Sequence, residues 1–135
     1  MKTLFDGPFQ TLAWDEGGSL LVVRDKPASA HMTRADFEEH ALRYAGALDD
    51  WRPRRVLVDA RESGFEADEA TSVWIDQHVF PHEAAVLARK AYVMSPSFLD
   101  EQDVDPEVAE ELDLPFRTAI LTSERAALDW LFTED

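Results

Sequence analysis

The pattern between Arg54 and Val79 constrains the fold of this chain more than any other feature. A continuous apolar run, Val56-Leu57-Val58, ends at Asp59, and a polar loop leads from there to an acidic helix start at Asp68. An apolar run without alternation is typical of a central strand that is buried on both faces of a parallel sheet. Loops that follow such strands are common docking places for ligands, because strand carboxyl ends and helix amino ends converge there. The sequence therefore predicts an α/β fold with its binding surface at this loop.

Periodicity and turn residues predict the other elements. We expect a hairpin with strands at 9–14 and 19–23, joined by a turn whose residues Gly17 and Gly18 are suited to positive φ. A helix is predicted after the cap residue Thr33, with Asp36 at capping-box spacing. The other expected elements are a linker at 27–32, a second helix at about 68–80 that Pro81 stops or kinks, one further turn at 82–88, strands at 90–94 and 116–121, a short helix within 100–113, and a final helix capped by Ser123.

The order of these elements is β-β-α-β-α-β-(α)-β-α in a single domain that spans residues 1–135. Strands separated by helices run parallel with right-handed crossovers, whereas the opening hairpin adds an antiparallel edge. A chain of 135 residues is long enough to bury one core. The expected fold class is α/β, a mixed β-sheet with helices packed against it.

The charge of the chain is strongly negative. Asp and Glu total 28 against 13 Lys and Arg, which gives a formal net charge of −15. Such a surface repels phosphate backbones and anionic membranes, so we expect no nucleic acid partner and no membrane insertion. Two interpretations of the acidic surplus stay open: a halophilic surface adapted to high salt, and an acidic face for a basic partner.

Cysteine is absent, which excludes disulfides, thiolate catalysis and cysteine metal sites. The first eight residues contain no apolar run of signal-peptide length, and the longest apolar runs elsewhere are far short of a membrane span. We therefore expect a cytoplasmic protein.

Three stretches of the sequence resemble a known family. They are the strand end Val56-Leu57-Val58-Asp59-Ala60-Arg61, the pair Trp74-Ile75-Asp76 and Val79-Phe80-Pro81, and the closing Phe116-Arg117-Thr118 with Ala126-Ala127-Leu128-Asp129-Trp130-Leu131. With the element order, they resemble the STAS, or SpoIIAA-like, fold, and most closely its small stand-alone bacterial members of unassigned function. The resemblance implies a SpoIIAA-like mixed sheet and a non-enzymatic interaction or regulatory module with a protein partner.

One functional motif of that family has no counterpart here. In its anti-sigma-factor antagonists, a partner kinase phosphorylates a serine at the start of the second helix, within an Asp-Ser-Ser-Gly motif. The matching stretch of this chain, Ala67-Asp68-Glu69-Ala70, contains no serine, and Ser63 lies earlier in the loop. The phosphorylation switch is therefore not expected, although Asp68 and Glu69 could supply a permanent negative charge near the same position.

The candidates for catalysis are few. Asp59, Arg61 and Glu62 could act as acid, base and anion clamp. An aspartate at a strand tip, however, more often accepts hydrogen bonds from loop amides. His78 and His82 have the i, i+4 spacing of metal ligands, with Pro81 between them to distort it. The glycines form neither a dinucleotide fingerprint nor a P-loop. We expect no catalytic residue, no metal and no cofactor.

The aromatic residues leave a further possibility open. Trp74, Phe80 and Phe98 are either core residues or the lining of an apolar cleft near the second helix, which would suit a small hydrophobic, lipid-like ligand. Three functions remain: a module that binds a protein partner or forms a homodimer, a carrier of a hydrophobic ligand, and an enzyme that uses Asp59 or the histidine pair. The predicted binding residues are Asp59, Arg61, Glu62, Ser63, Asp68, Glu69, Trp74, His78, Phe80 and Phe98.

Overall fold

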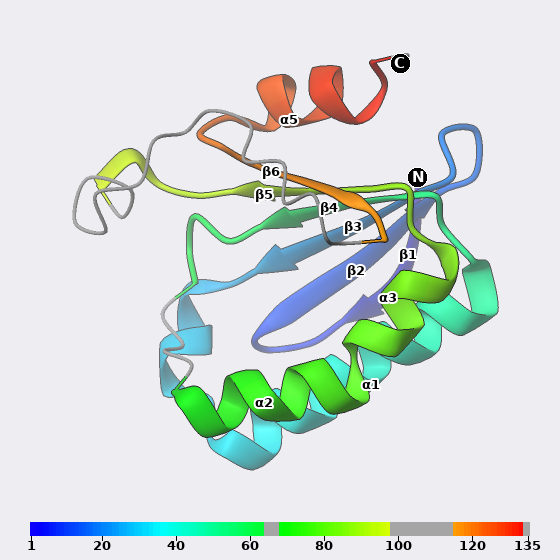
Figure 1. The fold of residues 1–135 in the computed structure, drawn as a ribbon. Coiled ribbons are helices and arrows are strands. Elements are labelled where there is room, and N and C mark those ends of the chain that lie inside the picture. The colour runs from blue at the N-terminus through cyan, green and yellow to red at the C-terminus, as the bar shows by residue number, and fades with distance from the viewer. Residues whose placement is uncertain (64–67, 98–114, 134–135) are drawn as a thin grey trace.

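The computed structural model describes residues 1–63, 68–97 and 115–133, which contain a mixed sheet of six strands (Figure 1). The strands follow one another across the sheet in chain order: β1 (Lys2–Asp6), β2 (Gln10–Asp15), β3 (Leu20–Asp25), β4 (Arg55–Asp59), β5 (Arg89–Val93) and β6 (Arg117–Leu121). The first three pair antiparallel, and β3 to β6 pair parallel. The α/β class and the antiparallel hairpin beside parallel strands are thus confirmed.

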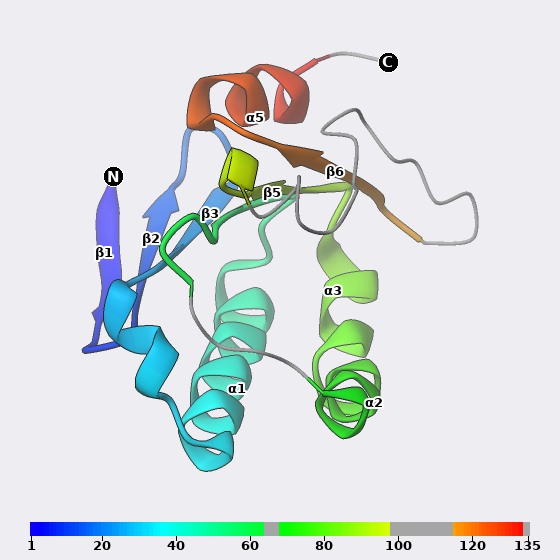
Figure 2. The same ribbon diagram turned by 90° about the vertical axis from the view of Figure 1, so that its left-hand side faces the viewer.

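Helices cover both faces of this sheet. One face is covered by α1 (Arg34–Trp51), α2 (Glu69–His78) and α3 (Phe80–Val86), and the opposite face by α5 (Glu124–Leu131) (Figures 1 and 2). The second helix ends at His78, close to the predicted break, and Pro81 stands in the first turn of α3. The predicted linker at 27–32 is wrong in detail, because Pro27–His31 forms a 3-10 helix.

Side-chain caps set the helix ends. The Oγ1 atom of Thr33 accepts a bond of 3.1 Å from the backbone N–H of Asp36, whose carboxylate accepts the backbone N–H of Thr33 in return. The side chains of Asp68 and Ser123 cap α2 and α5 by accepting the backbone N–H of Thr71 and Ala126. These caps satisfy backbone donors that a helix start leaves free, and they confirm the helix starts predicted from the sequence.

The sequence analysis missed one strand and assigned one positive φ to the wrong residues. The sequence does not reveal β1, because its mostly exposed side chains carry no apolar pattern. In the turn between β2 and β3, the positive φ belongs to Ser19, at 48°, and to no described glycine. Ser19 is held there because its hydroxyl and carbonyl oxygens accept the backbone N–H of Arg54. Gly18 serves close packing instead, since a Cβ there would lie 2.7 Å from the Phe132 ring.

The core has two parts, one on each side of the sheet. On the side of α1 to α3, buried residues include Leu12, Trp14, Leu21, Val23, Leu48 and Val56. On the side of α5 they are Leu20, Val22, Leu57, Ala91, Val93, Ala127 and Leu131. The prediction that the whole of Val56–Val58 is buried needs correction at Val58, which is only half-buried because it borders a cleft.

Two predicted features, the short helix within 100–113 and the position of Phe98, lie outside the described residues. Within the described ranges, no helix is both long and apolar enough to cross a membrane.

Candidate functional site

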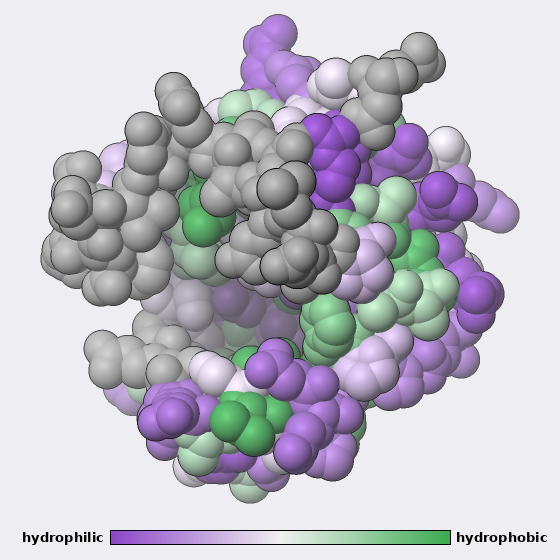
Figure 3. Space-filling model, viewed as in Figure 1, coloured by the Kyte–Doolittle hydropathy of each residue, from purple (hydrophilic) through white to green (hydrophobic). Residues whose placement is uncertain are grey.

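A cleft of about 770 Å³ lies between the sheet and the layer formed by α1, α2 and α3. It opens to the surface as a hollow above α2 (Figure 3). Strands β3 and β4 contribute Val23 and Val58 to its floor, and α1 contributes Ala41. The rest of its apolar lining consists of Met32, Phe37, Ile75, Val79, Phe80 and Phe116.

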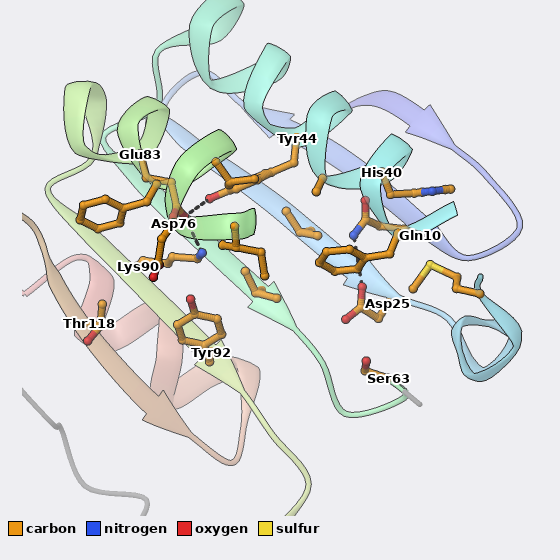
Figure 4. Close-up of a pocket in the computed structure, with 18 of the residues that line it drawn as sticks. Gln10, Asp25, His40, Tyr44, Ser63, Asp76, Glu83, Lys90, Tyr92 and Thr118 are labelled. Atoms are coloured by element: carbon orange, nitrogen blue, oxygen red, sulfur yellow. Dashed lines mark hydrogen bonds and ion pairs between the residues drawn. The ribbon is translucent and has the colours of Figure 1, made fainter. Parts of the chain in front are cut away.

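One end of the cleft carries a buried charged network. The hydroxyl of Tyr44 donates a hydrogen bond of 2.7 Å to Oε2 of Glu83, and the ammonium of Lys90 contacts the same oxygen (Figure 4). Glu83 and Lys90 are only 4% and 8% exposed. The Lys90 ammonium also lies 4.9 Å from the ring centroid of Tyr92 and 5.3 Å from that of Tyr44. Glu83 thus receives two donors, and Lys90 is charged because it has an anionic partner.

Burial shapes the pKa values at this end. Burial raises the pKa of the Tyr44 phenol well above its ordinary value, so this side chain is a neutral donor at physiological pH. For Lys90, burial acts to lower the pKa, but Tyr44, Tyr92 and Glu83 outweigh it and the pKa lies well above its ordinary value. This end therefore holds an ion pair that is neutral as a whole.

The other end of the cleft carries polar side chains without a cation. Gln10 donates through Nε2 to Oδ1 of Asp25 at 3.3 Å, and Ser63 also lines this end. Nδ1 of His40 lies 2.7 Å from the carbonyl oxygen of Asp36. Burial raises the pKa of Asp25 above its ordinary value. Figure 4 shows Gln10, Asp25, His40 and Ser63 together at this end, away from Glu83 and Lys90.

Asp59 lies on the opposite face of the sheet, in an arginine cluster. Its carboxylate accepts bonds of 2.9 and 2.8 Å from the guanidinium of Arg61 and one of 3.0 Å from Arg24. Arg24 in turn pairs with Glu124 of α5. These bonds, those of Arg61 above all, hold the pKa of Asp59 below its usual range, so the carboxylate is a weak base. The structure thus gives Asp59 a role in joining β3, β4 and α5.

The predicted residues at the start of α2 have local structural roles. Asp68 caps the helix, since its Oδ1 atom accepts the backbone N–H and the hydroxyl of Thr71, both at 2.7 Å. These bonds lower the pKa of Asp68. Glu69 is exposed in the first turn, and Glu62 is exposed in the loop before it.

The aromatic and histidine candidates around α2 have different partners and do not form one site. Trp74 packs against Phe37 at 6.2 Å and against His78 at 4.9 Å, measured between ring centroids. His82 instead bonds to Asp49 of α1 through Nδ1, at 2.9 Å. No group of three potential metal-binding side chains occurs among the described residues.

Of the predicted binding residues, the structure places Ser63 and Phe80 in the lining of the cleft. The other residues at its two polar ends were missed. A signal was present for Lys90, because a lysine in a strand paired on both sides is out of place unless it has a buried partner. Nothing in the local sequence marks Asp25, Gln10 or His40 as neighbours, since their proximity depends on the pairing of β2 with β3 and the placement of α1.

The chain matches no protein-family model, and no curated protein or solved structure matches it significantly.

Proposed function

We propose that this protein binds a small amphipathic molecule in the cleft and releases it unchanged, as a carrier or a sensor does. The volume of the cleft, about 770 Å³, carries the proposal. Small-molecule sites usually measure about 300–1,000 Å³, with apolar walls and a few polar groups that orient the ligand. Protein interiors are otherwise close-packed, so a gap of this size departs from what stability alone favours.

The side chains around the cleft support binding over a reaction. Glu83 and Lys90 neutralise each other and are held in place by Tyr44. Asp59, the acid or base candidate, is on the other face of the sheet and is engaged by two guanidinium groups. A general base needs a pKa near the working pH, whereas the arginine partners hold the pKa of Asp59 below its usual range.

A neutral apolar fluorophore tests the proposal directly. N-phenyl-1-naphthylamine, which becomes fluorescent when it leaves water, should bind to the parent protein in a saturable manner. Ala41→Phe fills the cleft from α1 and should abolish the signal. Leu42→Phe is the matched control, because residue 42 is the next position on the same helix and is 52% exposed.

Retention of the signal by Leu42→Phe and its loss in a folded Ala41→Phe would support the proposal. No saturable binding to the parent, or equal binding by a folded Ala41→Phe variant, would overturn it. Circular dichroism melts of all three proteins establish that the variants are folded.

A second candidate is the interaction module that the resemblance to the STAS family implies. The outer face of α2 favours it, because Val73 is an exposed large apolar residue at 49% and Ala70 beside it is also exposed. A partner that docks on α2 would lose affinity for Val73→Asp and keep it for Leu42→Asp on α1. Equal capture of the partner by the parent and both variants would remove α2 from the interface.

The finer fold assignment, SpoIIAA-like or STAS, is part of the same proposal. What supports it is an antiparallel hairpin that leads into parallel strands with helices between them, in the order that the resemblance implies.

A further inference from the structure

The two polar ends of the cleft differ in what they offer a ligand. The end at Glu83 and Lys90 is internally paired, whereas the end at Asp25 has a carboxyl group with no lysine or arginine partner among the described residues. We propose that the ligand is an organic cation, an apolar body with a protonated amine, whose ammonium group is held by Asp25. This inference rests on the proposed binding function and names the ligand class of the same cleft.

The unpartnered acceptors behind this end are closed to the ligand. Nε2 of His40 and the amide oxygen of Gln10 have no partner among the described residues, but each has almost no accessible surface, so a group in the cleft does not reach them. Asp25 is therefore the acceptor that a ligand meets at this end.

Asp25 has a neutral hydrogen-bond partner but no cation. Gln10 donates to its Oδ1 atom through Nε2 at 3.3 Å. No lysine or arginine among the described residues lies within ion-pair distance of Asp25. An ammonium group has three donors and one positive charge, and it would supply the cation that this carboxyl group lacks.

The rest of the cleft favours a cation over an anion. In the described lining, Lys90 is the one lysine or arginine, and Glu83 neutralises it. Asp25 and Asp76 remain without a compensating cation in that lining. The negative charge of the whole chain, −15, attracts organic cations and repels organic anions.

The walls suit the apolar body of such a ligand. Phe37, Phe80, Tyr92 and Phe116 line the cleft between its ends. Aromatic rings bury hydrocarbon, and their faces attract organic cations. A ligand can therefore lie along the aromatic walls with its amine at Asp25.

Three probes of equal chain length test the inference by displacement of N-phenyl-1-naphthylamine from the parent protein. They are decylammonium, decanol and decanoate, each used below its micelle concentration at pH 7. Decylammonium should displace the fluorophore at about tenfold lower concentration than decanol, the effect expected of one hydrogen-bonded charge pair. Decanoate should be the weakest of the three.

Two variants locate the ammonium site. The Asp25→Asn variant should still bind the fluorophore. Decylammonium and decanol should displace the fluorophore from this variant at equal concentrations. Its fold should be retained, because the site already favours a neutral side chain. Asp76→Asn is the matched control: it removes an exposed carboxylate from the other part of the lining, and the roughly tenfold preference for decylammonium should persist.

The results separate the two proposals. If the fluorophore binds and all three probes displace it equally, or decanoate is the strongest, the cation inference is overturned and the binding function stands. If Asp76→Asn reduces the preference as much as Asp25→Asn does, the general negative field accounts for it, and the site at Asp25 is overturned. If the fluorophore does not bind to the parent, the binding function itself fails.

Discussion

The two faces of the sheet bury different chemistry, although the same strands supply both. Along β3 and β4, Leu20, Val22 and Leu57 point to the face that α5 covers, while Leu21, Val23 and Val56 point to the face of α1 to α3. The first face is closed by one helix of eight residues, with small side chains such as Ala127 fully buried against the strands. The second face is covered by three helices and keeps a cleft of about 770 Å³.

The comparison extends to the charges. At the strand ends, Asp59 lies on the α5 face and is bound by Arg61 and Arg24, which lowers its pKa. Asp25 lies on the cleft face, where burial raises its pKa. The pKa values of two aspartates at the ends of neighbouring strands are thus shifted in opposite directions. The difference teaches that charges on one face join strands to α5, whereas on the other face a half-buried aspartate borders the cleft without a cationic partner among the described residues.

The largest expected effect comes from comparing the same substitution at two adjacent positions of β4, which face opposite sides of the sheet. Leu57→Asp puts a carboxylate into the closed face, where Leu57 is 0% exposed, and should abolish cooperative unfolding. The cost is expected to be several kcal/mol against a typical total stability of about 5–15 kcal/mol. Val58→Asp should keep a cooperative transition, because its carboxylate borders the cleft and reaches water.

Thermal melts by circular dichroism compare these two variants. A cooperative melt of Leu57→Asp near the parent temperature, or a greater loss in Val58→Asp, would contradict the assignment of the two faces.

The next effect concerns the buried pair in the cleft. Glu83→Gln leaves the Lys90 ammonium buried without its anion and should cost about 3–5 kcal/mol in free energy of unfolding. Glu38→Gln makes the same chemical change in a more exposed pair with Arg34 and should cost at most about 0.5 kcal/mol. Urea denaturation measures both.

A double variant sharpens this result. Adding Lys90→Met to Glu83→Gln removes the orphaned charge and should restore at least part of the loss. If the double variant is less stable than Glu83→Gln, the pair contributes more by packing than by charge compensation.

A smaller effect is expected from the two strand-end aspartates as pH changes. The pKa of Asp59 is lowered in the fold, so its contribution to stability is present above the ordinary pKa of about 3.9 and is lost as pH falls through the folded value. Asp59→Asn should cost about 1 kcal/mol at pH 7, since its arginine partners are partly exposed. The difference from the parent should vanish in acid.

Asp25 should show the opposite sign. Its pKa is raised, so the parent loses stability as pH rises from the ordinary pKa through the folded value, and Asp25→Asn should not. Unfolding free energies at several pH values check both variants. Parallel pH profiles for Asp25→Asn and the parent would show that Asp25 is not destabilised by its surroundings.

The smallest expected effect concerns the surface charge that surrounds both faces. Screening of the net charge of −15 should raise the melting temperature by a few degrees as potassium chloride increases. Most of the rise should occur between 0.01 M and 0.1 M, where the Debye length falls from about 30 Å to about 10 Å. A melting temperature that is flat or falls over this range would contradict salt adaptation and favour an acidic face for a basic partner.

Much of the fold could be predicted because its signals are local. The apolar run of β4, the capping residues Thr33, Asp68 and Ser123, and Pro81 between α2 and α3 act within a few residues of themselves. The strand β1 escaped prediction because it is held by pairing with β2 and not by a pattern of its own. Of the cleft, only Ser63 and Phe80 were predicted, because the lining comes from segments far apart in the chain.

The sequence by itself determined the α/β class, the alternation of residues between the two faces, and the helix starts, since these depend on short-range periodicity and capping. Only the tertiary structure decided which face closes and which keeps a cleft, because this depends on how far each helix lies from the sheet. It also decided the state of the two strand-end aspartates. Nothing near them in the chain assigns one to an arginine cluster and the other to buried acceptors, because a pKa is set by the groups that folding brings around it.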